Sequence, residues 1–245
     1  MKVTLQPAYV LHQHPYRETS ALIEVFTEDY GRVSLIAKGI KRKSSKVIGL
    51  LQPFQPLLIS WVGRSNLVTL TGVEASGSSI HLVGEPLICG FYLNELLLRL
   101  LSHQDSFKTL FSIYARSLLQ LACSEQYQPI LRLFERDLLI HLGYAPPLEY
   151  EIGTHQPIEA DQWYSYQIEK GPSKFKPSSS GNGMKLKGQT LLSLAYGKLT
   201  DSQSLWETKH LLRWLLSPYL GDKPLRSRTM LIALRQLTHE QTIEQ

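Results

Sequence analysis

The sequence contains one dense group of cations, between Lys38 and Lys46. Five of these nine residues are basic, namely Lys38, Lys41, Arg42, Lys43 and Lys46. Like charges at this density repel one another unless an anion neutralises them, and nucleic-acid phosphates are a common anion for loops at the edge of a barrel. The group therefore predicts a nucleic-acid-binding loop, with a solvated basic loop as the alternative.

The positive charge extends beyond this loop. Between Asp29 and Glu74 there is no acidic residue, and the basic residues in that interval are Arg32, Lys38, Lys41, Arg42, Lys43, Lys46 and Arg64. These seven charges exceed the net charge of +5 of the whole chain. If four to six of them contact phosphates, we expect log K to fall with log salt at a slope of about −3 to −5, with little dependence on DNA sequence.

A second, smaller basic group lies between Gly221 and Arg228. It comprises Lys223, Arg226 and Arg228 at the start of an expected helix. These cations could extend a DNA-binding surface or contact acidic groups of a protein partner. A solvated helix start explains them equally well.

Four aromatic residues near the basic interval are candidates for base stacking. They are Tyr9, Tyr16, Phe54 and Trp61. Aromatic side chains form sequence-tolerant platforms for unpaired bases, but they also fill cores, and we expect core packing for most of these four.

Catalytic and metal-binding patterns do not occur. The eight histidines are scattered, and no Cys-x-x-Cys or His-Glu-x-x-His spacing accompanies them. His12 and His14 share one face of an expected strand, without a nearby third ligand. The sequence also has no Gly-x-Ser-x-Gly, P-loop or Rossmann glycine pattern. We therefore expect a protein that is not an enzyme, with no catalytic residue, no metal and no cofactor.

Short apolar runs separated by turn residues predict β structure in residues 1–80. The five candidate strands are Leu5–Leu11, Ala21–Phe26, Arg32–Ala37, Pro56–Val62 and Leu67–Val73. Five strands of this length in one small domain favour an OB-fold barrel. The strand at Ala21–Phe26 is apolar on nearly both faces, so we expect the following helical part to pack against it.

A helical period begins at Pro86 and divides the rest of the chain. Residues 81–145 are expected to form the first part of a helical domain, with helices over roughly 86–101, 106–122 and 129–142. Residues 146–187 lose the periodicity and predict an irregular segment with one hairpin around Trp163–Ile168. Residues 188–245 are expected to add C-terminal helices that pack with the helical domain. The expected class is α+β.

The compartment follows from the cysteines and the N-terminus. Cys89 and Cys123 both lie in apolar, helix-like segments and are interpreted as small core residues of a protein from a reducing compartment. No signal peptide and no apolar run of about 20 residues is present. We expect a cytoplasmic protein that does not bind membranes.

The order of these features resembles the RecO family of bacterial DNA repair and recombination mediator proteins. The strings that carry the resemblance are Tyr9–His12, Glu18–Ser20, Val25–Thr27, Gly31–Val33, Ala37–Gly39, Leu51–Phe54, Tyr92–Leu96, Leu131–Glu135, Leu142–Tyr144 and Pro218–Gly221. Each string is short, but their order covers nearly the whole chain and fades only between about Glu149 and Lys187.

The resemblance implies an OB domain, a helical domain and no catalytic activity. It further implies binding of single- and double-stranded DNA, annealing of complementary strands, a nucleoid association, and action with RecR to help RecA replace single-stranded-DNA-binding protein (SSB). SSB would be bound through its acidic, apolar-ended C-terminal tail. In family terms Arg132 matches an arginine that binds this tail, and Leu131, Phe134 and Tyr92 would line the apolar pocket. From its position alone, Arg132 is a surface arginine beside an apolar stripe.

The chain departs from the family pattern in one segment. Many members carry a four-cysteine zinc module after the helical domain, whereas Pro146 to Lys187 contains no cysteine. This segment therefore resembles a degenerate, metal-free version of the module.

Two other functions compete with that of a mediator. The chain could be a protein adaptor whose basic loop binds acidic peptides and touches DNA only incidentally. It could also be a nuclease or hydrolase without a recognisable motif, which would turn over labelled DNA in the presence of magnesium.

Overall fold

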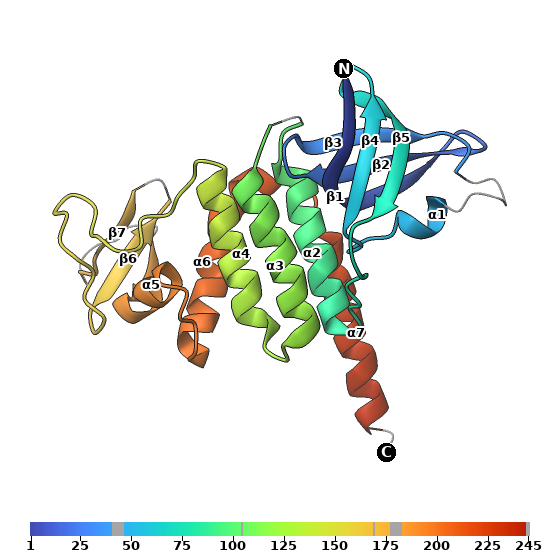
Figure 1. Ribbon diagram of the computed structural model, residues 1–245. Helices are drawn as coiled ribbons and strands as arrows, with labels where there is room; N and C mark the ends of the chain where they lie inside the picture. Colours follow the sequence, from blue (N-terminus) through green and yellow to red (C-terminus); the bar gives the residue numbers. More distant parts are fainter. Residues whose placement is uncertain (41–46, 104, 169, 177–182, 244–245) are drawn as a thin grey trace. The chain divides into compact units, whose positions relative to one another are not determined.

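The computed structural model describes residues 1–40, 47–103, 105–168, 170–176 and 183–243 (Figure 1). The chain divides into two compact units. The first comprises Met1–Glu125 together with Asp222–Gln245, and the second comprises Gln126–Gly221. The expected boundaries at residues 80, 145 and 187 do not coincide with the boundaries of these units, which are described one at a time below.

The first unit begins with a closed five-stranded barrel in the order β1-β2-β3-β5-β4. Its strands are β1 (Lys2–Tyr16), β2 (Ser20–Thr27), β3 (Gly31–Ala37), β4 (Leu57–Val62) and β5 (Leu67–Ala75). The β3–β5 pair is parallel and the other pairs are antiparallel. All five predicted strands are present, and the predicted OB-type barrel is confirmed. A short helix not anticipated from the sequence, α1 (Val47–Leu50), precedes β4.

Strand β1 closes the barrel because it pairs with both β2 and β4. Its register shifts between Val3 and Gln6 and again between Val10 and His12, and such irregularities let a long strand bend. The barrel interior is filled by aliphatic side chains and one aromatic one, among them Val10, Ile23 and Trp61. Their removal from water is the main stabilising contribution to this domain.

Three helices complete the first unit: α2 (Glu85–Leu100), α3 (Lys108–Cys123) and α7 (Arg226–Ile243). Pro86 stands in the first turn of α2, where its missing N–H costs nothing. Helix α2 packs against β1, α3 and α7. Strand β2 is buried on both faces, and Phe26 lies 5.4 Å from the ring of Phe111 on α3, measured between centroids. The prediction that a helical element covers β2 is therefore confirmed.

The second unit contains α4 (Tyr127–His141), α5 (Gly188–Ala195), α6 (Ser202–Leu220) and a three-stranded antiparallel sheet. The sheet has the order β7-β6-β8, with β6 (Trp163–Gln167), β7 (Gly171–Lys174) and β8 (Met184–Lys187). It stands where one hairpin was predicted. Tyr164 and Tyr166 of β6 are buried, so the sheet has a packed face of its own.

The two cysteines differ in their exposure. Cys89 is buried in α2 as expected, but Cys123 is exposed at the end of α3, so its interpretation as a core residue is wrong. Periodicity put Cys123 in a helix correctly, but the apolar stripe of that helix passes through Leu118 and Leu121 instead.

Within the described part of the chain, no helix is long and apolar enough to cross a membrane.

Candidate nucleic-acid and protein-tail interface

The basic loop is described only at its first residues. Lys38 directly follows β3 and is exposed. Lys41, Arg42, Lys43 and Lys46 lie outside the described residues, so their part in DNA binding stays a prediction from the sequence.

The exposed cations Lys38 and Arg64 lie at opposite ends of the β3–β5 strand pair. Ser34 of β3 is level with Leu67 of β5, and Arg64 lies in the turn that leads into β5, because Val62 of β4 pairs with Thr69 across that turn. Lys38 follows the end of the same strand. Lys38 lies four residues beyond Ser34, so at about 3.3 Å of rise per residue some 13 Å of strand separates it from the level at which the Arg64 turn enters β5. They therefore bound a strip of barrel surface and do not form one cluster.

Arg17, an exposed cation outside the acid-free interval, lies at the same end of the barrel as Lys38. Ala37 pairs with Ala21, and Ser20 pairs with Tyr16, so the β1–β2 turn meets the end of β3. Arg17 in that turn is exposed, and its guanidinium carbon lies 5.3 Å from the ring centroid of Tyr16. Arg17 precedes the acid-free interval in sequence and is followed by Glu18. Its position near the Lys38 end of the barrel therefore follows only from the pairing of the strands.

Arg32 is occupied inside the protein. Its Nε donates to Glu24 Oε2 at 2.8 Å, and its Nη1 donates to the carbonyl of Leu98 on α2. Ser34 donates to the other oxygen of Glu24 at 2.6 Å. Arg32 thus links the barrel to α2, which distinguishes it from the exposed cations Lys38 and Arg64.

The C-terminal basic group is anchored through its backbone. Arg99 of α2 donates to the carbonyls of Lys223 and Pro224. The carboxylate of Glu95 accepts from the backbone N–H groups of Arg226 and Ser227 at 3.0 Å each, and from the Ser227 hydroxyl at 2.7 Å. Glu95 therefore caps the N-terminus of α7 from another helix, where a negative charge is favourable.

The side chains of Lys223 and Arg226 remain exposed, and Arg228 is half-buried. Burial is the largest cause of the lowered pKa of His12, and the charges of His14 and Arg226 lower it further. Arg226 thus lies close enough to β1 for its charge to act on the barrel.

We expect the Glu95 cap to make stability depend on pH. Burial alone would raise the pKa of Glu95, but hydrogen bonds from Ser227 and Arg226 and the charge of Arg99 outweigh it, so the pKa lies below its usual value. The stabilisation is complete above the unfolded pKa of about 4.3 and is lost as the pH falls through the folded pKa. Thermal unfolding between pH 3 and 7 should therefore depend less on pH in Glu95→Gln than in the wild type. Glu18→Gln in the exposed β1–β2 turn is the control, and parallel curves for wild type and Glu95→Gln would contradict the cap.

Three of the four candidate stacking residues are buried. Tyr9 packs against Phe111 and Tyr114, Phe54 packs against Phe91, and Trp61 lies in the barrel interior. Tyr16 is half-buried beside Arg17. Of the four, Tyr16 is the one placed where an unpaired base could reach it.

The predicted tail-binding residues of α4 are buried in the second unit. Arg132 donates from Nη2 to Glu135 Oε1 at 2.7 Å, and the two side chains are 8% and 1% exposed. Arg132 Nε is buried and has no hydrogen-bond partner among the described residues. Leu131 and Phe134 are also buried, at 5% and 1%. Tyr92, the fourth predicted residue, is half-buried on α2 of the first unit.

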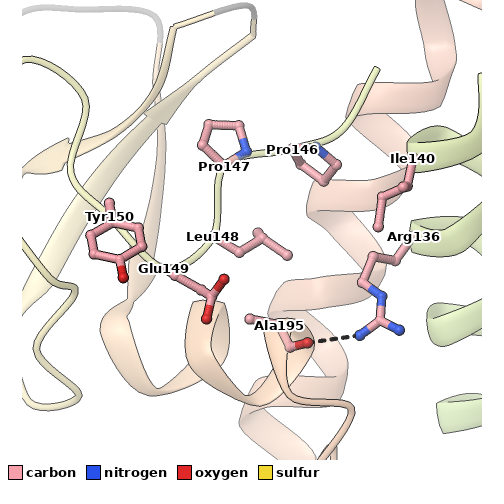
Figure 2. A pocket seen from close by; sticks show the side chains of 8 residues that line it. All are labelled: Arg136, Ile140, Pro146, Pro147, Leu148, Glu149, Tyr150 and Ala195. Atoms are coloured by element: carbon pink, nitrogen blue, oxygen red, sulfur yellow. Dashed lines mark hydrogen bonds between the residues drawn. The ribbon is translucent and has the colours of Figure 1, made fainter. Parts of the chain in front are cut away.

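A second arginine lies one turn further along α4. Arg136 donates to the carbonyls of Leu194 and Ala195 at the end of α5, at 2.6 and 3.0 Å, and pairs with Asp137. It lines a pocket of about 360 Å³. Figure 2 shows the other lining residues, which are Ile140, Pro146, Pro147, Leu148, Glu149, Tyr150 and Ala195. The mostly apolar walls suit the apolar end of a ligand. They also carry two charged side chains, the guanidinium of Arg136, which is already paired with Asp137, and the carboxylate of Glu149.

Comparison with known proteins accounts for both halves of the chain. Residues 1–78 match the family description "Recombination protein O N terminal", and residues 83–229 match "Recombination protein O C terminal". A DNA repair protein RecO from Nitrosococcus oceani is 62% identical over 237 residues, covering 97% of this chain and 96% of the relative. DNA repair proteins RecO from Nitrosospira multiformis and Aromatoleum aromaticum are 46% and 43% identical, covering 95% and 96% of this chain and 96% and 98% of their own lengths. The chain therefore belongs to the RecO family of DNA repair proteins.

Proposed function

We propose that this chain is a non-enzymatic recombination mediator. In this role it binds single- and double-stranded DNA, anneals complementary strands and, with RecR, helps to load RecA onto strands coated with SSB. The observation that carries the proposal is the acid-free strip of the OB-type barrel between Lys38 and Arg64, in a chain that belongs to the RecO family. Family membership supports a role in DNA repair and recombination, and the strip supports the contact with DNA.

The strip suits a phosphate backbone because residues 30–73, which supply β3 and most of β5, contain no carboxylate side chain. Strand β5 presents Thr69 between the levels of Arg64 and Lys38 and Thr71 at the level of Lys38, and Thr71 is exposed. Hydroxyl groups and cations are the usual partners of phosphate oxygens, and such contacts carry no sequence information. Single strands follow grooves of this kind across OB folds.

For the SSB tail we propose a site on α4. The tail ends in acidic and apolar residues, and α4 offers Arg132 within the core and Arg136 beside the pocket of Figure 2. Arg136 already lines a pocket and needs no rearrangement to do so. Arg132 would reach a tail carboxylate only by exchanging its contact with Glu135.

The experiment that tests DNA binding is its salt dependence. Lys41→Ala/Arg42→Ala/Lys43→Ala should weaken binding to a single-stranded oligonucleotide and make the log–log salt slope shallower by about 2, since each lost phosphate contact accounts for about 0.7. Lys38→Ala/Arg64→Ala should make it shallower by about 1.4 on the same basis. Fluorescence anisotropy measured between about 50 and 300 mM salt gives both slopes.

The matched control is Arg116→Ala, which removes an exposed cation from α3 in the same unit. Its slope should equal that of the wild type. Unchanged affinity at low salt in both barrel variants would remove the main argument for the proposal and favour a protein adaptor. Turnover of labelled DNA in the presence of magnesium would favour the nuclease alternative.

Mediator function is distinguished from plain DNA binding by annealing on SSB-coated oligonucleotides. We expect the wild type to anneal such strands and Lys41→Ala/Arg42→Ala/Lys43→Ala to do so much more slowly. A protein that binds naked DNA but fails with SSB-coated strands would contradict the mediator role while leaving DNA binding intact.

A further inference from the structure

The three-stranded sheet of the second unit has an outer face that combines aromatic rings with lysines. Side chains alternate along β6, so Tyr164 and Tyr166 are buried while Trp163 is 39% exposed. In the register of the sheet, Trp163 of β6 pairs with Lys187 of β8. The N–H of Phe175, just after β7, donates to the carbonyl of Trp163 at 2.8 Å. We call the set of Trp163, Phe175, Lys185 and Lys187 the Trp163 face.

The lysines of this face are held over the rings. Lys185 Nζ lies 4.6 Å from the ring centroids of both Trp163 and Phe175, and Lys187 Nζ lies 6.0 Å from that of Trp163. Neither ammonium has a carboxylate within 4.0 Å in the described part of the chain, whereas the neighbouring Lys174 pairs with Glu159. Positive charge is therefore concentrated where the rings are accessible.

The surrounding sequence adds to this charge. Residues 163–187 contain five lysines and one acidic residue, Glu169, although no function was assigned to this segment from its sequence. A sheet that only filled space would not need an exposed indole flanked by two lysines that have no carboxylate partner among the described residues. The combination of a planar apolar ring and ammonium groups matches one chemical class of ligand, an unpaired base attached to phosphates.

We propose that the Trp163 face binds single-stranded DNA, with a base stacked on the indole of Trp163 and phosphates contacted by Lys185 and Lys187. Stacking of a base on an aromatic ring is stronger than a cation–π contact at an exposed site, so a base can displace Lys185 from the ring while the lysine moves to a phosphate. An acidic peptide would use the lysines but leave the rings without a planar partner.

This inference rests on the proposed function and gives the chain a second strand-binding surface, on the other compact unit from the barrel. Annealing brings two complementary strands together, and separate surfaces on one chain suit that task. The segment from Pro146 to Lys187, which has no cysteines, would then bind DNA without a metal.

The direct test is ¹⁹F NMR of the full-length protein labelled with 5-fluorotryptophan. The chain has four tryptophans, and Trp163→Phe identifies the resonance of Trp163 by its loss. A fifteen-nucleotide oligothymidylate, roughly one or two OB-fold site lengths, should shift that resonance. An abasic oligonucleotide of equal length should shift it much less. A shift caused by polyglutamate but not by oligothymidylate would overturn the proposal in favour of a peptide site.

Affinity measurements give a second readout. Lys185→Ala/Lys187→Ala should make the salt slope for single strands shallower by about 1.4. Trp163→Ala should weaken binding of single strands at least several-fold and leave duplex affinity unchanged, because paired bases cannot stack on the ring. Trp206→Ala, which removes a 63% exposed indole from α6, and Lys198→Ala are the matched controls. Trp163→Phe, which keeps an aromatic ring, should retain most of the affinity. If the alanine variant unfolds, Trp163→Leu, which is apolar but offers no ring for stacking, replaces it as the stacking test.

The outcomes separate this inference from the proposed function. If the wild type binds no DNA at all, the proposed function itself fails. If it binds DNA through the barrel cations but the Trp163 resonance and both Trp163-face variants behave as wild type, the second surface alone is excluded.

Discussion

Arg132→Ala should lower the free energy of unfolding of the Gln126–Gly221 unit by about 3–5 kcal/mol. Arg132 and Glu135 form a buried ion pair at 2.7 Å, and truncation of the arginine leaves the carboxylate of Glu135 in a site that is 1% exposed. Removal of one partner from a buried ion pair costs far more than the pair contributes. Urea denaturation combined with hydrogen exchange of the α4 amides measures the loss in this unit.

A variant that removes both charges tests the mechanism. Arg132→Met/Glu135→Met replaces the pair by apolar side chains of similar size, which is often neutral or stabilising, so most of the lost stability should return. Lys174→Ala is the matched control. It breaks a pair whose side chains are 49% and 58% exposed, and such exposed pairs contribute little to stability. A small effect of Arg132→Ala, comparable to that of Lys174→Ala, would show that the pair is not isolated from water.

The instability expected of Arg132→Ala makes that variant unsuitable as a test of SSB-tail binding. Loss of tail binding in Arg132→Ala would be ambiguous because the unit itself is destabilised. Arg132→Met/Glu135→Met removes the guanidinium from a folded unit, so loss of binding of a labelled tail peptide to that variant would identify Arg132 as the tail-binding residue. If binding persists there and is lost in Arg136→Ala, the pocket of Figure 2 is the site.

The barrel was predictable because its signals are local. Each strand is a short apolar run bounded by turn residues, and the two-faced apolar pattern of β2 indicated a covering helix, which is α3. The excess of seven positive charges in the acid-free interval was also visible in the sequence. The positions of these charges in space could not be predicted. They depend on the parallel β3–β5 pairing, which joins segments distant in sequence and separates Lys38 from Arg64.

The sheet of the second unit was only partly predictable. Strands β7 and β8 have four residues each, too few for a periodic pattern, and their sequences contain Gly, Pro and Lys. Their pairing depends on β6, whose buried tyrosines need a packed face. The Trp163 face arises from that pairing, so the sequence contains its lysines and aromatic residues but does not show that they share a face.

Arg132 shows the limit of pattern and resemblance together. Position beside an apolar stripe predicted a surface arginine, and the family resemblance predicted a tail contact. The burial of Arg132 is determined by the packing of α4 in its unit and by Glu135, one turn away on the same helix. A buried i,i+3 pair has the same sequence spacing as an exposed one, so the two cannot be distinguished before the helix is placed.

Asn94→Leu should destabilise the first unit by about 2–5 kcal/mol, because several buried polar groups lose a partner at once, at about 1–3 kcal/mol each. Asn94 on α2 donates to the carbonyls of Val10 and Leu11 at 3.4 and 3.1 Å, and accepts from the hydroxyl of Tyr114 on α3 at 2.6 Å. Val10 and Leu11 stand where the β1–β2 register shifts, so the amide compensates for the bulge and joins the barrel to two helices. Thermal unfolding of the first unit, followed by hydrogen exchange in β1, measures the loss.

The Asn94 contacts should also be coupled. Burial is the largest cause that raises the pKa of Tyr114 far above its usual value, so its hydroxyl needs a partner within the protein. Tyr114→Phe removes that need, and Asn94→Leu/Tyr114→Phe should therefore cost less than the sum of the single changes. Asn66→Ala in the exposed β4–β5 turn is the control and should change stability by less than about 0.5 kcal/mol. Additive losses would show that Asn94 acts on the β1 bulge alone, whereas a coupled loss would show that barrel and helices are held together through one amide.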